Sequence, residues 1–241
     1  MPERFLILQH VDVEHPGIFR HFMAADGIVC DTVELDVGET IPALEDYAAL
    51  IVMGGPMDTW EEHLHPWLVD EKAAIRHAVQ TLDKPYLGVC LGHQLLAAAL
   101  GGTIGKAPQA EVGVMPVTLT ADGIASPFFG AVQARFECLQ WHGAEVQVAP
   151  PGAQVLAYSP ACAVQSLAIG GRAFSFQFHV EVEPNTVDDW VAIPAYRDSL
   201  TRVLGPAGAD GFRTRAAQCM PDFNALARRL YDNWRRHAFR V

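Results

Sequence analysis

One cysteine of the sequence stands between two glycines, in Gly88-Val89-Cys90-Leu91-Gly92, where an apolar run ends and an alanine- and leucine-rich run begins. This spacing has the form of a nucleophile elbow, a sharp strand-to-helix turn that needs small residues two positions to either side of a strained nucleophile. The amino end of the following helix would favour a thiolate and stabilise an oxyanion. The pattern therefore predicts that Cys90 is a nucleophile, exposed at the carboxyl end of a strand.

A nucleophilic cysteine needs a general base, and the base needs an acid that orients it. In "FSFQFHVEVEP" (174–184), His179 and Glu181 stand two positions apart, the spacing that places two strand residues on one face. A carboxylate beside an imidazole fixes its tautomer and stabilises the imidazolium that forms when the thiol loses its proton. We therefore predict a catalytic triad of Cys90, His179 and Glu181.

Three other interpretations of these residues remain open. A non-catalytic paralogue that only binds a partner would be expected to lack a triad residue, and all three are present. An α/β-hydrolase with a cysteine nucleophile shares the elbow, but its acid precedes its histidine, whereas Glu181 follows His179. His63 and His65 could suggest a metal site, but the sequence offers no third ligand beside them.

The elements that must position the triad alternate in the first half of the chain. Short apolar runs predict strands, and between them the spacing of apolar residues predicts amphipathic helices. The runs are 4–10, 29–36, 48–56 and 85–90, and the helical segments are 15–27, 65–83 and 91–102. Such alternation predicts an α/β fold with a mainly parallel sheet covered by helices on both faces.

The second half of the chain predicts antiparallel strands that extend the sheet, followed by helices. Strand-like runs follow one another with short turns between residues 113 and 181, and the text is helical from Pro184 onward. We expect residues 1–190 to form the catalytic domain and 191–241 to form a helical C-terminal extension packed on it. The extension after Pro184 could be a lid, a dimer surface or a partner-binding surface, and its first part, 185–200, could close over the site.

Composition limits the classes of partner. The formal net charge of −11 argues against a general nucleic-acid or anionic-membrane surface, because like charges repel. Five widely spaced cysteines without a CxxC pair suggest neither a disulfide framework nor a zinc site. Neither a signal peptide nor a transmembrane run is recognisable, so the cytoplasm is the expected location.

Several blocks of the sequence together resemble one enzyme family. "PYLGVCLGHQ" (85–94) and "FQFHVEVEP" (176–184) resemble the two signatures of the class I (triad) glutamine amidotransferases. "IVMGGPMDTW" (51–60), "EVGVMPV" (111–117) and "LQWHGAEV" (139–146) are similar to further blocks of that family, in the same order. The resemblance covers roughly residues 4–190 and is greatest for stand-alone proteins similar to the glutaminase domain of GMP synthase. It implies a flavodoxin-like, doubly wound sheet.

The resemblance also implies the chemistry. Cys90 would attack the γ-carboxamide of glutamine to form a γ-glutamyl thioester, His179 would pass the proton to the leaving ammonia, and Glu181 would orient His179. The backbone N–H groups of Gly55 and Leu91 would form an oxyanion hole. The glutamine pocket would include Gly54, Pro56, Gln94, Trp141 and His142.

Two positions depart from the family pattern. Val180 stands where a proline often separates the histidine from the glutamate. Ala144 replaces the acidic residue that commonly follows the glycine of the "WHG" block, and Glu145 comes one position later. We expect Glu145 to bind the α-ammonium group of the substrate; if it does not reach that group, another γ-glutamyl compound would fit better than free glutamine.

The implied chemistry needs neither a metal ion nor an organic cofactor, and the expected ligand is a small-molecule substrate. The sequence has neither a pyrophosphatase loop nor a Walker A loop that would use the released ammonia. A separate ammonia-accepting synthetase could therefore be the partner. Alternatively, the protein is a self-contained γ-glutamyl peptide or amine hydrolase.

Overall fold

One nine-stranded sheet organises the computed structural model, which describes residues 3–239. The strand order is β2-β1-β3-β4-β9-β8-β7-β5-β6. The first five strands in this order pair in parallel: β2 (Val29–Glu34), β1 (Arg4–Gln9), β3 (Ala49–Val52), β4 (Tyr86–Val89) and β9 (Ala173–Phe176). This order is that of a flavodoxin-like sheet, so the predicted α/β class and doubly wound topology are confirmed.

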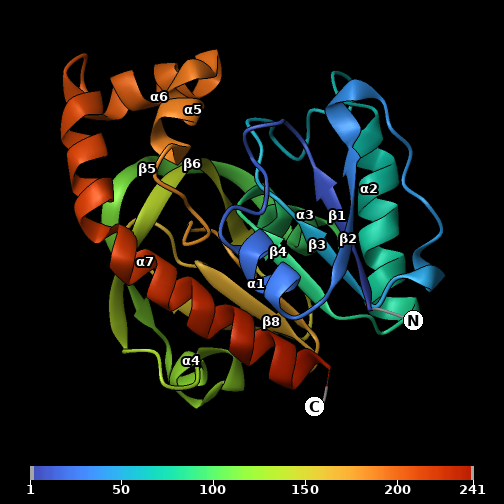
Figure 1. Cartoon of the computed structure of the whole chain (residues 1–241). Helices are drawn as coiled ribbons and strands as arrows, with labels where there is room; N and C mark the ends of the chain where they lie inside the picture. Colours follow the sequence, from blue (N-terminus) through green and yellow to red (C-terminus); the bar gives the residue numbers. More distant parts are fainter. Residues whose placement is uncertain (1–2, 240–241) are drawn as a thin grey trace.

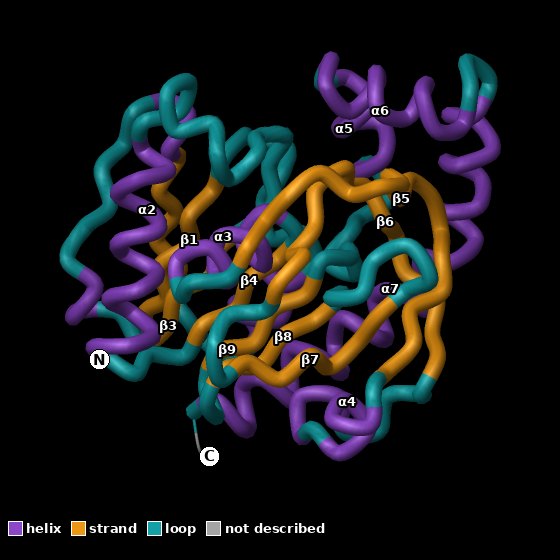
Figure 2. The backbone as a smooth tube through the Cα atoms, turned by 180° about the vertical axis from the view of Figure 1, so that it is seen from behind, coloured by secondary structure: helices purple, strands orange, loops and turns teal. Residues whose placement is uncertain are grey.

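The remaining strands are antiparallel, as predicted, and continue the same sheet. They are β5 (Thr103–Leu119), β6 (Arg135–Val148), β7 (Ala153–Tyr158) and β8 (Ser166–Ile169). β5 starts ten residues earlier than the run that predicts it, because its first half pairs with the far end of β6. Figure 2 shows these two long strands curling away from the parallel half of the sheet.

Helices cover both faces of the parallel half, because successive strand residues point to opposite sides. On one face, Phe5 and Ile7 of β1 pack in a cluster with α1 (Phe19–Ala25) and the C-terminal half of α7 (Gly208–Ala238). On the other face, Leu6 and Leu8 pack with α2 (Trp67–Arg76) and α3 (Leu91–Ala99). Figure 1 shows α7 crossing the first face.

The C-terminal helices pack in two places. α5 (Thr186–Ala192), α6 (Pro194–Leu204) and the first half of α7 form a cluster with the middle of β5 and β6, and the rest of α7 belongs to the main core. Figure 1 shows α5 and α6, in orange, beside the labelled β5 and β6. A short helix, α4 (Ala121–Ala125), follows β5. A boundary at residue 190 between two units stays a prediction.

Within residues 3–239, we find no helix with both the length and the apolar character needed to span a membrane.

Candidate active site

Cys90 lies in the turn between β4 and α3, and its backbone is strained. Its φ of 50° and ψ of −101° form a combination that residues with a side chain rarely adopt. A Cβ atom at Gly88 would lie 2.8 Å from the carbonyl oxygen of Gly92, and one at Gly92 would lie 2.1 Å from the carbonyl oxygen of Val52. The two glycines are therefore needed because the elbow folds back on itself and α3 starts directly against β3.

The Cys90 side chain is only 6% exposed, so the prediction of an exposed nucleophile is wrong. The reason is that β9 and the helices beyond it cover the end of β4, a tertiary effect that the local motif does not contain. The thiol borders a cavity of about 160 Å³, through which a substrate would reach it. Gln177 donates a hydrogen bond from Nε2 to the Cys90 sulfur over 3.4 Å.

His179 and Glu181 contact one another beside this cavity. His179 follows the end of β9, and its backbone exchanges hydrogen bonds of 2.8 and 3.2 Å with Leu139 of β6. Its Nδ1 lies 2.6 Å from Oε1 of Glu181. The N–H of Val180 donates to Oε2 of the same carboxylate over 2.9 Å, a bond that a proline at this position could not make. The departure at Val180 therefore adds support to Glu181.

The Cys90 thiol and the His179 imidazole shift each other's pKa. Burial lowers the pKa of His179, but the charges of Glu181 and Cys90, together with hydrogen bonds to both, raise this pKa well above its usual value. Burial raises the pKa of Cys90 above its usual value, and His179 only partly offsets this effect. Burial thus opposes ionisation of the thiol and His179 favours it, and the expectation that the helix terminus favours a thiolate stays a prediction. His179, made basic by Glu181, is the group that can accept the thiol proton.

The turn at the end of β3 is held by two buried residues that the sequence analysis missed. His10 places Nδ1 2.8 Å from the carbonyl oxygen of Gly54 and Nε2 2.8 Å from Oε1 of Glu71. Burial lowers the pKa of His10, but the charge of Glu71 and the hydrogen bonds to Glu71 and Gly54 together raise it above its usual value. Both ring nitrogens can then donate hydrogen bonds. A histidine directly after a strand, at the edge where ligands bind, is the signal that could have identified it.

The two predicted oxyanion-hole residues border the cavity together with Cys90. Gly55 follows the turn held by His10, and a Cβ atom there would lie 3.0 Å from Cδ2 of Leu91. Leu91 is the first residue of α3, so its N–H has no acceptor within the helix. Both N–H groups therefore belong to backbone beside the nucleophile, which is the placement an oxyanion hole requires.

Most of the predicted pocket residues line the cavity. Pro56, Gln94, Trp141 and His142 line the cavity. Gly54 is not part of the lining and contributes through its carbonyl group, which accepts the hydrogen bond from His10. The cavity is also lined by residues that were not predicted to belong to the pocket, among them Met57, Asp58, Ala195, Tyr196 and Ser199.

Glu145 is not among the residues that line the cavity, so the expectation that it binds the substrate stays a prediction. Its carboxylate instead raises the pKa of the buried Cys162 thiol through its charge and a hydrogen bond. The neighbouring Ala144 lines the cavity with a methyl group only.

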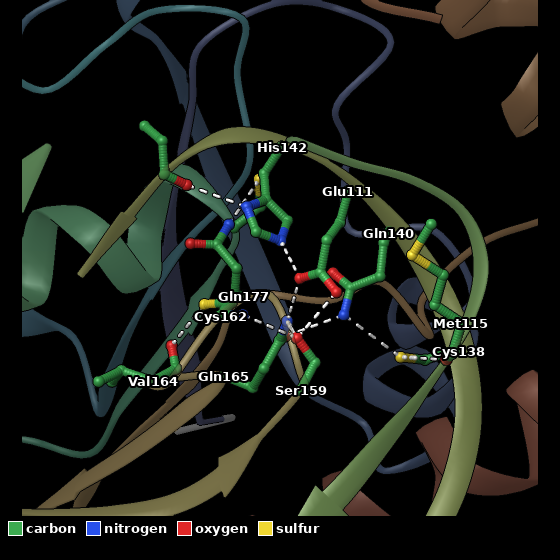
Figure 3. Close-up of polar contacts among 12 residues, drawn as sticks. Glu111, Met115, Cys138, Gln140, His142, Ser159, Cys162, Val164, Gln165 and Gln177 are labelled. Atoms are coloured by element: carbon green, nitrogen blue, oxygen red, sulfur yellow. Dashed lines mark hydrogen bonds and ion pairs between the residues drawn. The ribbon is translucent and has the colours of Figure 1, made fainter. Parts of the chain in front are cut away.

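A buried cluster of Glu111, His142 and Cys162 has the composition of a metal site. Figure 3 shows, however, that Glu111 is already surrounded by donors: Ser159 lies 2.8 Å from Oε1, and Gln165 and His142 lie 2.7 and 3.1 Å from Oε2. Burial raises the pKa of Cys162 to about 12, which keeps the thiol protonated and therefore a poor ligand. The cluster fits a hydrogen-bond network that holds His142 against the cavity better than it fits an ion.

Glu14 is another carboxylate near the triad, and the sequence patterns do not predict it. Its side chain lies in the loop after β1 and is buried, and Oε1 accepts a hydrogen bond from the Tyr196 hydroxyl. Within the described residues Oε2 has no partner, and a Cβ atom at Gly54 would lie 2.4 Å from it. Burial raises the pKa of Glu14 to about 7, although the charge of His179 and the Tyr196 hydrogen bond lower it.

This carboxyl group makes stability depend on pH. Because its pKa rises from 4.5 to about 7 on folding, the folded protein holds the proton more tightly than the unfolded chain. Stability from this group is therefore present below pH 4.5 and is lost as the pH rises through 7, by about 3 kcal/mol at about 1.4 kcal/mol per pKa unit. In Glu14→Gln we expect that loss to disappear when urea unfolding is measured at pH 5 and pH 8.

The control is Glu62→Gln, which removes an exposed carboxylate. It should keep the pH dependence of the parent protein. If Glu14→Gln and the parent lose the same unfolding free energy between pH 5 and pH 8, Glu14 is already ionised in the folded protein at pH 5.

Helix α6 forms one wall of the cavity, and α5 packs against His179. Tyr196 and Ser199 of α6 line it, and Ser199 accepts a 3.0 Å hydrogen bond from the Trp141 indole N–H. Trp190 of α5 packs edge-on against the His179 ring, with centroids 4.6 Å apart, and donates a 3.1 Å hydrogen bond to the carbonyl oxygen of Val13. The C-terminal helices therefore cover the triad, as one of the three sequence hypotheses for this segment supposes.

Two known enzymes are similar to part of this chain. A GMP synthase [glutamine-hydrolyzing] from Aeropyrum pernix is 35% identical over 162 residues, which are 65% of this chain and 29% of the relative. Gamma-glutamyl peptidase 3 from Arabidopsis thaliana is 30% identical over 142 residues, which are 57% of this chain and 56% of the relative. The match thus spans less than a third of the first relative and about half of the second.

Among solved structures, a glutamine amidotransferase from Thermotoga maritima superimposes with a TM-score of 0.86 at 27% identity, over 97% of this chain and 98% of that one. Residues 18–192, which include Cys90, His179 and Glu181, match the family described as glutamine amidotransferase class-I. The chain therefore belongs to the class-I glutamine amidotransferase family.

Proposed function

We propose that this protein hydrolyses the γ-carboxamide of glutamine to glutamate and ammonia, with Cys90, His179 and Glu181 as the catalytic triad. The observation that carries the proposal is that a strained, buried cysteine at the edge of a cavity interacts with a histidine that a carboxylate supports. Membership of an enzyme family that is named for its use of glutamine supports the same reaction.

In the proposed mechanism, the Cys90 sulfur attacks the amide carbon while His179 accepts the thiol proton. The N–H groups of Gly55 and Leu91 stabilise the oxyanion that forms. His179 then gives its proton to the leaving nitrogen, so ammonia departs and a γ-glutamyl thioester remains. Water, deprotonated by His179, attacks the thioester, and glutamate leaves as the thiol is restored. Glu181 stabilises the imidazolium in both halves of the reaction.

The size of the cavity supports a small substrate. Its volume of about 160 Å³ is below the roughly 300–1,000 Å³ of pockets for drug-sized ligands. A substrate with the dimensions of a single amino acid fits this space better than a longer γ-glutamyl peptide. A self-contained γ-glutamyl peptide or amine hydrolase is the second candidate, and the similarity to a gamma-glutamyl peptidase favours it.

An ammonia-accepting synthetase is the partner that the first candidate implies. The relative from Aeropyrum pernix is named as a glutamine-hydrolysing GMP synthase, and the match covers only 29% of its length. If this chain hydrolyses glutamine only slowly by itself, we propose that a separate synthetase receives the ammonia that it releases. The non-catalytic alternative is disfavoured because the three triad side chains contact one another or share the same buried environment.

The test is release of ammonia and glutamate by the purified protein, with free glutamine and a panel of γ-glutamyl amides and dipeptides as substrates. Turnover of glutamine supports a glutaminase, and turnover of one dipeptide with glutamine inert supports a γ-glutamyl peptidase. Silence on all compounds, with Cys90 still alkylated by a glutamine-like chloroketone, supports a subunit that awaits its synthetase. Silence without alkylation would overturn the proposal in favour of a non-catalytic protein.

A further inference from the structure

Asp58 is the only carboxylate among the described residues that line the active-site cavity. It lies in the loop between β3 and α2, three residues after Gly55, and not on β6. The same lining contains neither lysine nor arginine. A positively charged group that entered this cavity would therefore find one formal negative charge there besides the triad.

The loop around Asp58 is fixed by its neighbours. The backbone N–H of Asp58 donates to Oε2 of Glu61 over 2.9 Å, and the ammonium group of Lys72 donates to the carbonyl oxygen of Thr59 over 3.0 Å. Thr59 itself is buried. Asp58 is thus presented to the cavity by a loop that other residues hold in place.

The carboxylate of Asp58 has no structural role within the described residues. It accepts no hydrogen bond from residues 3–239, and Glu61, not Asp58, caps the turn. Burial and then the charge of Glu61 raise the pKa of Asp58, while the exposed Lys106 lowers it without reaching ion-pair distance. A partly desolvated carboxylate without a close partner is stabilised by a bound cation.

The substrate of the proposed reaction supplies such a cation. A γ-glutamyl compound carries an α-ammonium group four bonds from the amide carbon that Cys90 attacks. On β6 the position that commonly holds an acidic residue is Ala144, and Glu145 faces Cys162 instead. The negative charge that the substrate needs is therefore absent from the β6 side and present on the loop after β3.

We propose that Asp58 binds the α-ammonium group of the γ-glutamyl substrate and thereby selects substrates with a free α-amino group. This inference rests on the proposed function, because it names a contact within the same site. It assigns to the β3–α2 loop a recognition role that the family pattern would place on the "WHG" block.

The test compares two ligands in a background that cannot consume them. Cys90→Ser and Cys90→Ser/Asp58→Asn are titrated with glutamine and with 4-carbamoylbutanoate, which is glutamine without its α-amino group, by isothermal titration calorimetry. A hydrogen bond between charged groups contributes about 1.5–3 kcal/mol, so Asp58→Asn should weaken glutamine binding roughly 10- to 100-fold. Binding of 4-carbamoylbutanoate should stay the same or improve.

Asp70→Asn in the Cys90→Ser background is the matched control, because it removes one negative charge from the exposed first turn of α2. It should leave both affinities unchanged. An equal loss for both ligands, or no loss for glutamine, in Asp58→Asn would overturn the inference and leave the proposed function standing. If neither γ-carboxamide binds and no γ-glutamyl dipeptide binds either, the proposed function fails and the inference fails with it.

Discussion

Replacing Cys90 by serine is expected to lower glutamine hydrolysis by on the order of 10³-fold or more, because the reaction loses the nucleophile that forms the thioester. A serine hydroxyl is a much weaker acid than a thiol, so His179 cannot generate the corresponding anion. The substitution is small, and the change in unfolding free energy should stay within about 1 kcal/mol. The measurements are kcat/KM from glutamate release and urea unfolding followed by circular dichroism.

The control for this variant is Cys30→Ser, which changes a thiol on β2 that lies against Met23, away from the cavity. It should keep the activity of the parent protein. Full activity of folded Cys90→Ser would show that the triad assignment is wrong. A glutamine-like chloroketone that alkylates the parent protein but not Cys90→Ser would establish that the reactive thiol is Cys90.

The fold, the elbow at Cys90 and the pair of His179 and Glu181 could be predicted from the sequence because their signals are local. A strand, a turn and a helix that follow one another within 20 residues define the elbow, and His179 and Glu181 are separated by one residue. The alternation of apolar runs and helical stripes then specifies a parallel sheet, whose carboxyl edge gathers the turns after its strands. The elbow motif and the predicted parallel sheet therefore both place Cys90 at the carboxyl edge of the sheet.

The other groups of the site could not be predicted because their partners are distant in the sequence. Glu14 and Tyr196 are 182 positions apart, and no spacing rule connects them. The burial of Cys90 depends on β9 and on the C-terminal helices, which pack over the elbow only in the complete fold.

Asp58 was overlooked for a different reason. It lies inside a block that the sequence analysis already used, three residues after the glycine of the oxyanion turn, but a single aspartate in a loop has no periodicity to distinguish it. Only the lining of the cavity identifies it, together with the absence of another carboxylate from that lining in the described chain. Specificity is therefore harder to predict here than chemistry, because it depends on which loop side chains face the substrate.

Replacing Gly92 by alanine is expected to destabilise the fold by about 3 kcal/mol or more, because no rotamer can move a Cβ atom away from backbone. The added atom would lie 2.1 Å from the carbonyl oxygen of Val52, and the N–H of Gly92 already donates to the carbonyl oxygen of Met53 over 3.0 Å. α3 would have to move away from β3, and Cys90 with it. Urea unfolding measures the loss of stability, and the rate of Cys90 alkylation by iodoacetamide measures the displacement.

Gly211→Ala is the matched control, since a Cβ atom there meets nothing within 4 Å and the residue lies within α7. Alanine is the better helix former, so this variant should be as stable as the parent or more stable by up to about 1 kcal/mol. If Gly92→Ala is equally stable, α3 does not start against β3 at this distance. If Gly92→Ala is destabilised as expected, the packing of α3 against the sheet requires glycine at this position. A glycine there is then evidence for the fold rather than for the reaction.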